Sequence, residues 1–454
     1  MNIQAYDSVW REALYLKLRR LGFGGKTLDF IKSMYHNDNI KFLINGHLSQ
    51  PLFLTQGVKQ GNGLIKTFKK RKLLYYSGCN LSPLLFSIFI SNLGTKLNQT
   101  GLGITLGSIN ISTIFFADDI VVMGKDKASL DELMRMTRIF CRNHHLEISI
   151  NKSKVMTHSA ECGTTIFGGE EDLVDITLDQ VMAFKYLGVT VSTKPHGFFK
   201  NHNENVKAKS RQYLQRVLSL VKTGPDRSDL AYSLWTNCAL PAILYGCEVV
   251  PLNQGTIQEI ERCQARVGKF ILQVPSSSSS VTTNIDCGFK PVWSVIAEKV
   301  LLYSHRLMSK PASYWPKLAF LDHINCGASS YVKYLNKWKD ATNSFGVHTK
   351  QIRKNVKHFA IKHVYEDQKS TCTTSFALSC PGKTPENVWF RPKPWISDSC
   401  FTKTFAEFRV CNAGLGNRGP TKDGRFFKLC PLCLDKGDIQ LNNEVGLKIL
   451  LEVG

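Results

Sequence analysis

Two adjacent aspartates interrupt the apolar stretch STIFFADDIVVMG, which covers residues 112–124. Aspartate is uncommon in strands, and removing two neighbouring like charges from water carries a large free-energy cost. One interpretation is a hairpin turn in which Ala-Asp-Asp only reverses the chain. The other is that the carboxylates of Asp118 and Asp119 are held at the end of a strand to bind a divalent metal ion. The stretch alone leaves both interpretations open.

The composition indicates a globular protein with a polyanionic partner. Of the 454 residues, 43% are hydrophobic, and 58 Lys and Arg against 36 Asp and Glu give a formal net charge of +22. Such a charge favours nucleic acid over an anionic membrane surface as the partner. The fourteen cysteines form no dense framework, which indicates reduced thiols in a cytosolic or nuclear protein. The sequence shows neither a signal peptide nor an apolar run of about 18 residues, so we expect no membrane segment.

The elements that position the two aspartates follow from the spacing of the apolar residues. Helical spacing predicts helices over residues 8–21, with Ser8 as the N-cap, and over residues 82–97 and 127–146. Asn45-Gly46, between two apolar runs, predicts a hairpin turn. The aspartates would then lie between two helices along the chain.

Several short segments follow one another in a defined order. AYDSVWREALYLKLRRLGFGGKTLDFIKSMY comes first, then Gln60-Gly61 and CNLSPLLF, then the Ala-Asp-Asp stretch, LEISINKSK and FKYLG. In this order they resemble the palm motifs of reverse transcriptases, specifically those of non-LTR (LINE-type) retrotransposons. LPAILYGCEVVPL and the segment around CPLC resemble the downstream region of these enzymes. Nearly the whole chain therefore resembles an N-terminally truncated copy.

The resemblance implies an α+β fold, in which a polymerase palm of antiparallel sheet and helices precedes a helical thumb and a mostly helical C-terminal region. The sequence pattern agrees, because helices and strands alternate at first and helical patterns dominate later. The expected domains are a reverse transcriptase palm remnant (1–195), a thumb-like helical region (196–275), a helical basic C-terminal region (281–425) and a degenerate zinc-knuckle-like tail (426–454).

The resemblance also implies the chemistry of the site. Asp118 and Asp119 are the expected catalytic residues and the expected ligands of Mg²⁺ (or Mn²⁺), in a two-metal nucleotidyl transfer. Lys154 resembles the lysine that protonates the pyrophosphate leaving group, although a solvated charge at a strand end explains it equally well. The implied partners are an RNA template, a DNA primer and dNTPs.

Other residues are implied contacts of the nucleotide and the primer. The expected substrate-binding residues are Tyr6, Gln60, Gly61, Ser82 and Phe116, and Phe116 would alternatively support the turn or fill the core. The expected primer-binding residues are Tyr186, Leu187 and Gly188, where the glycine permits close backbone approach. The basic residues Lys207, Lys209, Arg211 and Arg216 form either a thumb surface that follows the phosphate backbone or a solvated helix face.

The first motif departs from the family pattern. Met1 stands where the family has a metal-binding aspartate, and Asp7 is not a substitute because its side chain points to the other strand face. We therefore expect no measurable primer extension by this chain. The alternative function is a non-enzymatic basic RNA- or DNA-binding remnant of a decayed element. A helical DNA-binding protein unrelated to polymerases would require the ordered segments to be coincidental.

Two further departures concern an insertion and the tail. Residues 62–78 separate GVKQG from CNLSPLLF, as either a retained intron or a real surface loop would. Cys430 and Cys433 are half of a tetrahedral zinc site, but Gly446 stands where the family has histidine. We therefore interpret the tail as a broken remnant and do not expect zinc binding.

Overall fold

Fifteen segments of the chain are described by the computed structural model. They are residues 8–36, 39–40, 43–44, 47–58, 62–68, 71–77, 81–107, 109–157, 163–168, 174–194, 197–222, 227–278, 280–326, 330–344 and 346–371. Tyr6, Asp7, Gln60, Gly61, Cys430, Cys433 and Gly446 lie outside them, so the roles assigned to these residues stay predictions. The chain divides into two compact units, Met1–Phe184 and Lys185–Gly454.

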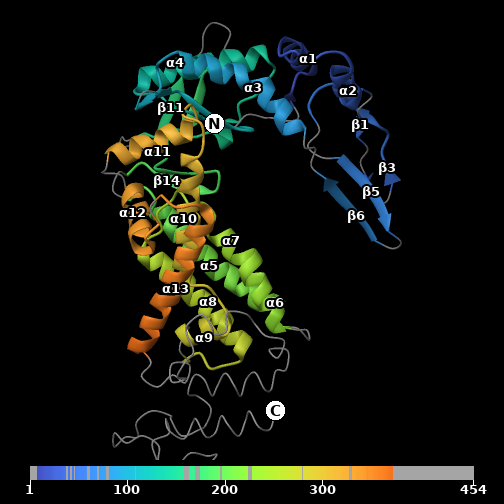
Figure 1. Cartoon of the computed structure of the whole chain (residues 1–454). Coiled ribbons are helices and arrows are strands. Elements are labelled where there is room, and N and C mark those ends of the chain that lie inside the picture. Colours follow the sequence, from blue (N-terminus) through green and yellow to red (C-terminus); the bar gives the residue numbers. More distant parts are fainter. Residues whose placement is uncertain are drawn as a thin grey trace, which may run out of the picture. The chain divides into compact units, whose positions relative to one another are not determined.

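The first unit combines helices with short strand pairs (Figure 1). Its helices are α1 (Arg11–Arg20), α2 (Gly25–Tyr35), α3 (Ser82–Gln99) and α4 (Lys127–Asn143), and a 3₁₀ turn, η2 (Ile150–Lys152), follows α4. Antiparallel pairs join β1 (Asn39–Ile40) to β4 (Leu52–Phe53), β2 (Leu43–Ile44) to β3 (His47–Leu48), β5 (Asn62–Phe68) to β6 (Arg71–Ser77), β7 (Ile104–Leu106) to β8 (Ile109–Ile111), β9 (Thr113–Phe116) to β10 (Asp119–Val122) and β11 (Thr164–Phe167) to β12 (Ile176–Asp179). The expectation of mixed helix and antiparallel sheet is confirmed.

The helix predictions are largely confirmed, with differences of up to three residues at the helix ends. The predicted helices at 82–97 and 127–146 correspond to α3 and α4, and the side chain of Asp126 caps α4 by accepting the Ser129 N–H at 2.7 Å. The prediction of Ser8 as a helix cap is wrong. Helix α1 begins at Arg11, and Trp10 occupies the N-cap position without a side-chain hydrogen bond.

The predicted hairpins are also present as paired strands. Ile44 lies opposite His47 in the β2–β3 pair, so the two strands flank Asn45-Gly46 as predicted. Strands β5 and β6 pair along their whole length, from Asn62 opposite Ser77 to Phe68 opposite Arg71. A paired hairpin suits the surface-loop interpretation of residues 62–78, and the retained-intron interpretation stays a hypothesis about the transcript.

The core of the first unit forms around α3. Its buried face carries apolar residues at intervals of three and four, as expected for a helix packed on one side: Leu85, Phe86, Phe89, Leu93 and Leu97. Buried residues from α1, α4 and β10 belong to the same core, among them Leu14, Leu18, Leu133 and Ile120. Each such fully buried side chain contributes roughly 1.5–3 kcal/mol. Helix α3 is therefore the element on which the neighbouring strands are placed.

Lys17 lies half-buried between α1 and α3, where its Nζ donates to the Phe89 carbonyl at 2.7 Å. Burial lowers the pKa of this lysine to about 8. Because the unfolded chain keeps the ordinary, higher pKa, it binds more protons than the folded chain between about pH 8 and 10.5. The Lys17 contribution therefore makes the folded state more stable as the pH rises through this interval.

We expect Lys17→Met to remove this pH dependence. The free energy of unfolding of the wild type, relative to Lys17→Met, should rise from pH 8 to pH 10 by at most about 1.4 kcal/mol per pH unit. Urea unfolding followed by circular dichroism at several pH values measures the difference. Lys350→Met, at an exposed position of the chain, is the control and should show no such trend. Equal pH profiles for the wild type and Lys17→Met would contradict the prediction.

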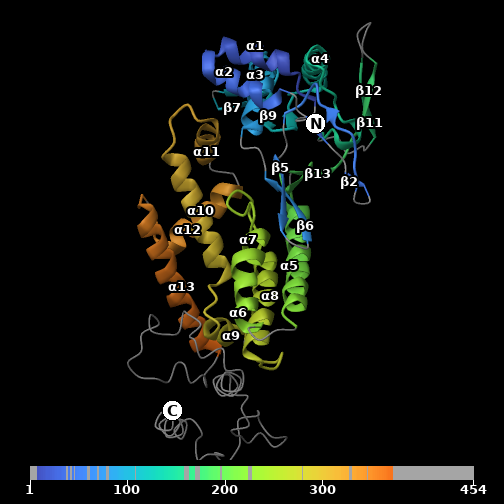
Figure 2. The ribbon, with the colours of Figure 1, turned by 90° about the vertical axis from the view of Figure 1, so that its right-hand side faces the viewer.

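The second unit contains the helices after the short β13–β14 pair (Figure 2). Strand β13 (Ala183–Tyr186) begins in the first unit, and β14 (Val189–Ser192) follows it. The helices are α5 (Lys200–Leu220), α6 (Arg227–Ser233), the π-helix η3 (Leu234–Ala239), α7 (Leu240–Ile243), α8 (Gln254–Leu272), α9 (Ser280–Asp286), α10 (Val292–Met308), α11 (Trp315–Cys326), α12 (Ser330–Thr342) and α13 (Thr349–Thr371). Helix α5 lies beside α8, and α10 beside α13.

The core of the second unit includes a buried tryptophan with a complete set of polar contacts. Trp235 is 0% exposed, and its Nε1 donates to the Gln264 Oε1 at 3.2 Å. The amide of Gln264, itself buried, donates to the Lys290 carbonyl at 3.0 Å. This chain of hydrogen bonds satisfies polar groups that would otherwise be costly to bury.

None of the helices in the described segments combines the length and the apolar character that crossing a membrane would require.

Candidate functional site

The two aspartates lie at the tip of the β9–β10 hairpin. Asp119 is opposite Phe116, so Ala117 and Asp118 form a two-residue turn. Ala117 has a φ of +52°, a left-handed conformation that is strained for a residue with a Cβ atom. Both aspartates are half-buried. Asp118 and Asp119 therefore lie both at a hairpin turn and at the end of a strand, so the two interpretations from the sequence describe the same element.

Phe116 points away from the core. Its side chain is 62% exposed, and Ile114, two residues earlier on the same strand face, is 45% exposed. The interpretation of Phe116 as a core-filling residue is therefore wrong. An exposed aromatic ring beside the turn is consistent with the predicted contact to a nucleotide, which stays a prediction.

The base of the hairpin is fixed to α3 by polar contacts. Asn98 of α3 accepts the N–H groups of Ser112 at 2.8 Å and Thr113 at 3.1 Å through its Oδ1. Thr113 Oγ1 in turn donates across the hairpin to the Val121 carbonyl at 3.0 Å. Ile120, directly after the aspartates, is fully buried. The carboxylates therefore extend from a strand pair whose position is set by helix packing and hydrogen bonds.

A glycine lets α3 approach the hairpin closely. A Cβ atom at Gly94 would lie 2.8 Å from Cε2 of Phe115, well inside van der Waals contact. The ring of Phe115 therefore lies against the helix backbone, and only glycine fits at this position without a shift.

We expect Gly94→Val to displace the hairpin and to destabilise the first unit by about 1–3 kcal/mol, because a branched side chain must push the Phe115 ring away. Chemical denaturation measures the loss. Gly255→Val is the matched control, since Gly255 is an exposed helical residue whose added Cβ meets its nearest neighbour at 3.7 Å. A loss no greater than that of the control would contradict the close packing.

Ser82 and Lys154 have different surroundings in the first unit. Ser82 begins α3 and is 1% exposed, and its hydroxyl has no hydrogen-bond partner among the described residues. Lys154 Nζ forms an ion pair with Asp179 Oδ2 of β12 at 2.5 Å. This pair gives Lys154 a structural partner, and its role in protonating pyrophosphate stays a prediction.

Arg11 is a positioning residue that sequence reasoning missed. The side chain is buried at the start of α1, and its guanidinium donates to the carbonyls of Gly57 at 2.8 Å, Leu54 at 2.7 Å and Gln56 at 3.1 Å. Gly57 also donates its N–H to the Val9 carbonyl at 2.9 Å. These contacts fix the segment that leads toward the predicted Gln60-Gly61 motif. The sequence of α1, which is rich in Lys and Arg, gives no sign that one of these side chains is buried.

The predicted primer-binding residues form the tip of a second tight hairpin. Leu187 and Gly188 have φ values of +46° and +85°, the pattern of a type I′ turn, and connect β13 to β14. A Cβ atom at Gly188 would lie 2.9 Å from Cε1 of Tyr245, so the glycine does allow a close approach. The approaching group in this structure is the ring of Tyr245, which is 56% exposed.

Helix α5 holds the second hairpin through Thr190 of β14. The Thr190 N–H donates to His202 Nδ1 at 3.3 Å, and Asn205 Nδ2 donates to Thr190 Oγ1 at 3.1 Å. Burial, and then the nearby charges of Lys209 and Lys185, lower the pKa of His202. A neutral imidazole is the form that accepts a hydrogen bond at Nδ1. The spacing of polar residues on a basic helix did not reveal these contacts.

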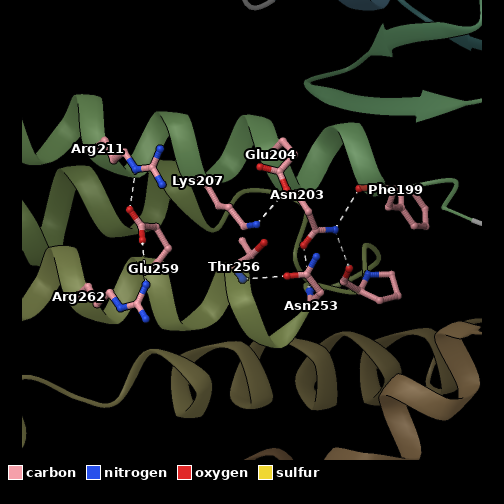
Figure 3. Close-up of polar contacts among 10 residues, drawn as sticks. Phe199, Asn203, Glu204, Lys207, Arg211, Asn253, Thr256, Glu259 and Arg262 are labelled. Atoms are coloured by element: carbon pink, nitrogen blue, oxygen red, sulfur yellow. Dashed lines mark hydrogen bonds and ion pairs between the residues drawn. The ribbon is translucent and has the colours of Figure 1, made fainter.

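The basic residues of α5 are engaged within the second unit (Figure 3). Lys207 pairs with Glu204 at 2.9 Å, and Arg211 pairs with Glu259 of α8 at 2.6 Å. Lys209 donates to the Ala242 carbonyl, and its pKa is lowered mainly by burial. Partly exposed ion pairs of this kind contribute little to stability and can exchange for phosphate contacts. The phosphate-backbone role of this helix stays a prediction.

Polar contacts at the start of α8 connect α5 to α8 (Figure 3). Asn203 of α5 is buried, and its Nδ2 donates to the carbonyls of Phe199 at 3.0 Å and Pro251 at 3.3 Å. Its Oδ1 accepts the Asn253 N–H at 2.9 Å, while Asn253 caps α8 by accepting the Thr256 N–H at 2.8 Å. These hydrogen bonds hold α5 and α8 together, and α5 in turn supports the β13–β14 hairpin, which precedes it in the sequence.

The donor set at Asp118 and Asp119 suits a hard divalent cation. Carboxylate oxygens are the ligands that Mg²⁺ prefers, and Mg²⁺ usually binds through one or two carboxylates and retains several waters. In the described segments, no group of three or more His, Cys, Asp and Glu side chains gathers at one place. Metal binding at Asp118 and Asp119 therefore stays a prediction, which rests on the two carboxylates alone.

Comparison with known families decides the nature of this region. Residues 3–191 match the family described as reverse transcriptase (RNA-dependent DNA polymerase). This region is a reverse transcriptase domain. It contains the Asp118-Asp119 hairpin and ends within β14, after the Leu187-Gly188 turn.

Curated relatives of this reverse transcriptase come from insect retrotransposons. A "Retrovirus-related Pol polyprotein from type-1 retrotransposable element R2" of Popillia japonica is 23% identical over 296 residues, which cover 63% of this chain and 44% of the relative. An "RNA-directed DNA polymerase from mobile element jockey" of Drosophila melanogaster is 22% identical over 338 residues, 73% of this chain and 34% of the relative. The "Probable RNA-directed DNA polymerase from transposon BS" of the same species is 22% identical, with 67% and 32% covered.

The reverse transcriptase domain is therefore of the non-LTR retrotransposon type, as the ordered motifs predicted. The chain spans less than half of the length of each of these relatives.

Proposed function

We propose that this chain is the polymerase core of a non-LTR retrotransposon protein, in which Asp118 and Asp119 bind divalent metal for RNA-directed DNA synthesis. The observation that carries the proposal is the rigid hairpin, whose tip presents two partly exposed carboxylates inside a reverse transcriptase domain. Bound Mg²⁺ would supply Lewis-acid activation of the primer hydroxyl and neutralisation of the triphosphate charge.

The remaining residues of the site have supporting roles in this proposal. The exposed ring of Phe116 contacts the incoming nucleotide beside the carboxylates, whereas Ser82, at the start of α3, is buried and has no direct nucleotide contact in this proposal. The hairpin of Tyr186, Leu187 and Gly188 contacts the primer strand. The substrates are then an RNA template, a DNA primer and dNTPs.

The second candidate function is non-enzymatic binding of RNA or DNA. It is favoured by the net charge of +22 and by the pairing of Lys154 with Asp179, which leaves the predicted proton donor engaged elsewhere. In this case the aspartate pair is an inherited feature, and the chain binds nucleic acid through its basic surfaces alone.

Primer extension separates the two candidates. The full chain is incubated with oligo(dT) annealed to poly(rA), dTTP and either Mg²⁺ or Mn²⁺, and in parallel its binding to the same duplex is measured without dTTP. Metal-dependent incorporation that Asp118→Ala abolishes supports catalysis. Binding without incorporation, the result expected from the departure in the first motif, supports the non-enzymatic function. Incorporation that persists in Asp118→Ala would contradict the assignment of the aspartates.

A further inference from the structure

The corner between α10 and α11 carries exposed aromatic and basic side chains. The exposed corner, which we define as Arg306, Met308, Lys310, Tyr314, Trp315 and Lys317, lies outside the reverse transcriptase domain. Tyr314 is 42% exposed and Trp315 is 40% exposed. Large aromatic rings with this exposure are costly to leave in water, which makes the corner a candidate binding surface.

One cation of the exposed corner, Lys310, lies next to one of its rings. Lys310 Nζ lies 5.9 Å from the centroid of the Tyr314 ring. Lys317 Nζ donates to the carbonyls of Met308 at 2.8 Å and Lys310 at 2.7 Å, which fixes the connection between the two helices. Tyr314 also donates its N–H to the Pro311 carbonyl at 3.1 Å. These contacts place Lys310 beside Tyr314 and hold the connection between α10 and α11 before any partner binds.

Among the described residues, no acidic side chain forms an ion pair with the cations of the exposed corner, Arg306, Lys310 and Lys317. By contrast, Lys207 and Arg211 of α5 pair with glutamates. Clustered cations without carboxylate partners favour a polyanionic ligand over a protein surface.

We propose that the exposed corner binds single-stranded nucleic acid, with bases stacked on Tyr314 and Trp315 and phosphates near Lys310 and Arg306. Aromatic rings stack with unpaired bases whatever their sequence, while a duplex keeps its bases covered by its own stacking. A base on the Tyr314 ring would place its phosphate within reach of Lys310, since the ring and the ammonium group are already neighbours. This binding is separate from the aspartate hairpin and needs no nucleotide or metal.

The test uses the full chain, fluorescently labelled oligo(dT) and oligo(U), and fluorescence anisotropy in the absence of dNTP. Tyr314→Ala/Trp315→Ala should weaken binding of both strands by at least about fivefold, because stacking is worth about 1–3 kcal/mol per base. Tyr314→Phe/Trp315→Phe keeps the rings and should bind like the wild type. The phenylalanine variant shows that a loss in the alanine variant reports on stacking. Circular dichroism verifies that each variant is folded.

Reversing the charge of Lys310 is the second part of the test. Lys310→Glu should weaken binding and reduce the dependence of affinity on salt, because a phosphate contact is lost. Lys350→Glu, at an exposed position of α13, changes the net charge by the same amount away from the corner and should have a smaller effect. Equal losses for Lys310→Glu and Lys350→Glu, or unchanged affinity in Tyr314→Ala/Trp315→Ala, would overturn the proposal. So would an equal loss of blunt-duplex and single-strand binding in Tyr314→Ala/Trp315→Ala, whatever the primer-extension result.

Discussion

Asp118→Asn/Asp119→Asn is expected to weaken Mn²⁺ binding to the chain by at least about 100-fold, since it removes both anionic ligands while keeping the side-chain volume. Loss of groups that only support a metal ligand already weakens metal binding by about 10- to 100-fold, and loss of the ligands themselves should exceed this. Electron paramagnetic resonance of free Mn²⁺ in a titration measures the affinity without requiring catalysis. The result therefore tests metal binding even if the chain does not extend a primer.

The control must remove the same number of charges elsewhere. Asp322→Asn/Asp340→Asn changes two carboxylates on α11 and α12 and should leave the Mn²⁺ affinity unchanged. If this control weakens Mn²⁺ binding as much as the hairpin variant does, the effect is one of net charge. If the wild type shows no saturable Mn²⁺ site, the proposed role of the hairpin is wrong.

Trp235→Ala is expected to cause the largest loss of stability in the second unit, about 3–5 kcal/mol. The tryptophan side chain is fully buried, so its removal loses apolar contacts and leaves a cavity. It also leaves the Oε1 of the buried Gln264 without the Trp235 hydrogen bond, which adds a desolvation cost of about 1 kcal/mol. Denaturant unfolding of the full chain, followed by circular dichroism, measures the change.

Trp315→Ala is the matched control, because it removes the same side chain from a position that is 40% exposed. We expect its effect on stability to stay within about 0.5 kcal/mol. A comparable loss in both variants would show that burial does not decide the cost.

The local elements were predictable from the sequence because their signals are short-range. Apolar residues at helical spacing over residues 82–97 predicted α3, and the apolar runs on both sides of Ala-Asp-Asp indicated the hairpin that β9 and β10 form. The reverse transcriptase domain was recognised because its short sequence motifs follow one another in a fixed order. Each motif lies at or near a single hairpin or helix. Evidence of that kind does not require knowledge of which side chains meet.

What the sequence did not reveal depends on contacts between distant residues. Arg11 contacts carbonyls more than forty residues away, and Lys154 pairs with Asp179, twenty-five residues later. A single sequence contains no signal for either contact, because the charge of Arg11 or Lys154 fits a solvent-exposed position equally well. Ser8 was misjudged for a related reason, since a good capping residue does not cap a helix that starts three residues later.

The backbone at Ala117 limits what evolution can place beside the carboxylates. At a φ of +52°, position 117 accommodates glycine or a residue with a short polar side chain. A β-branched residue there would oppose the turn and favour an extended strand. An extended strand would separate Asp118 and Asp119 onto opposite faces, since successive side chains alternate. The identity of one small, chemically inert residue therefore determines whether two acidic neighbours can act on a common ion.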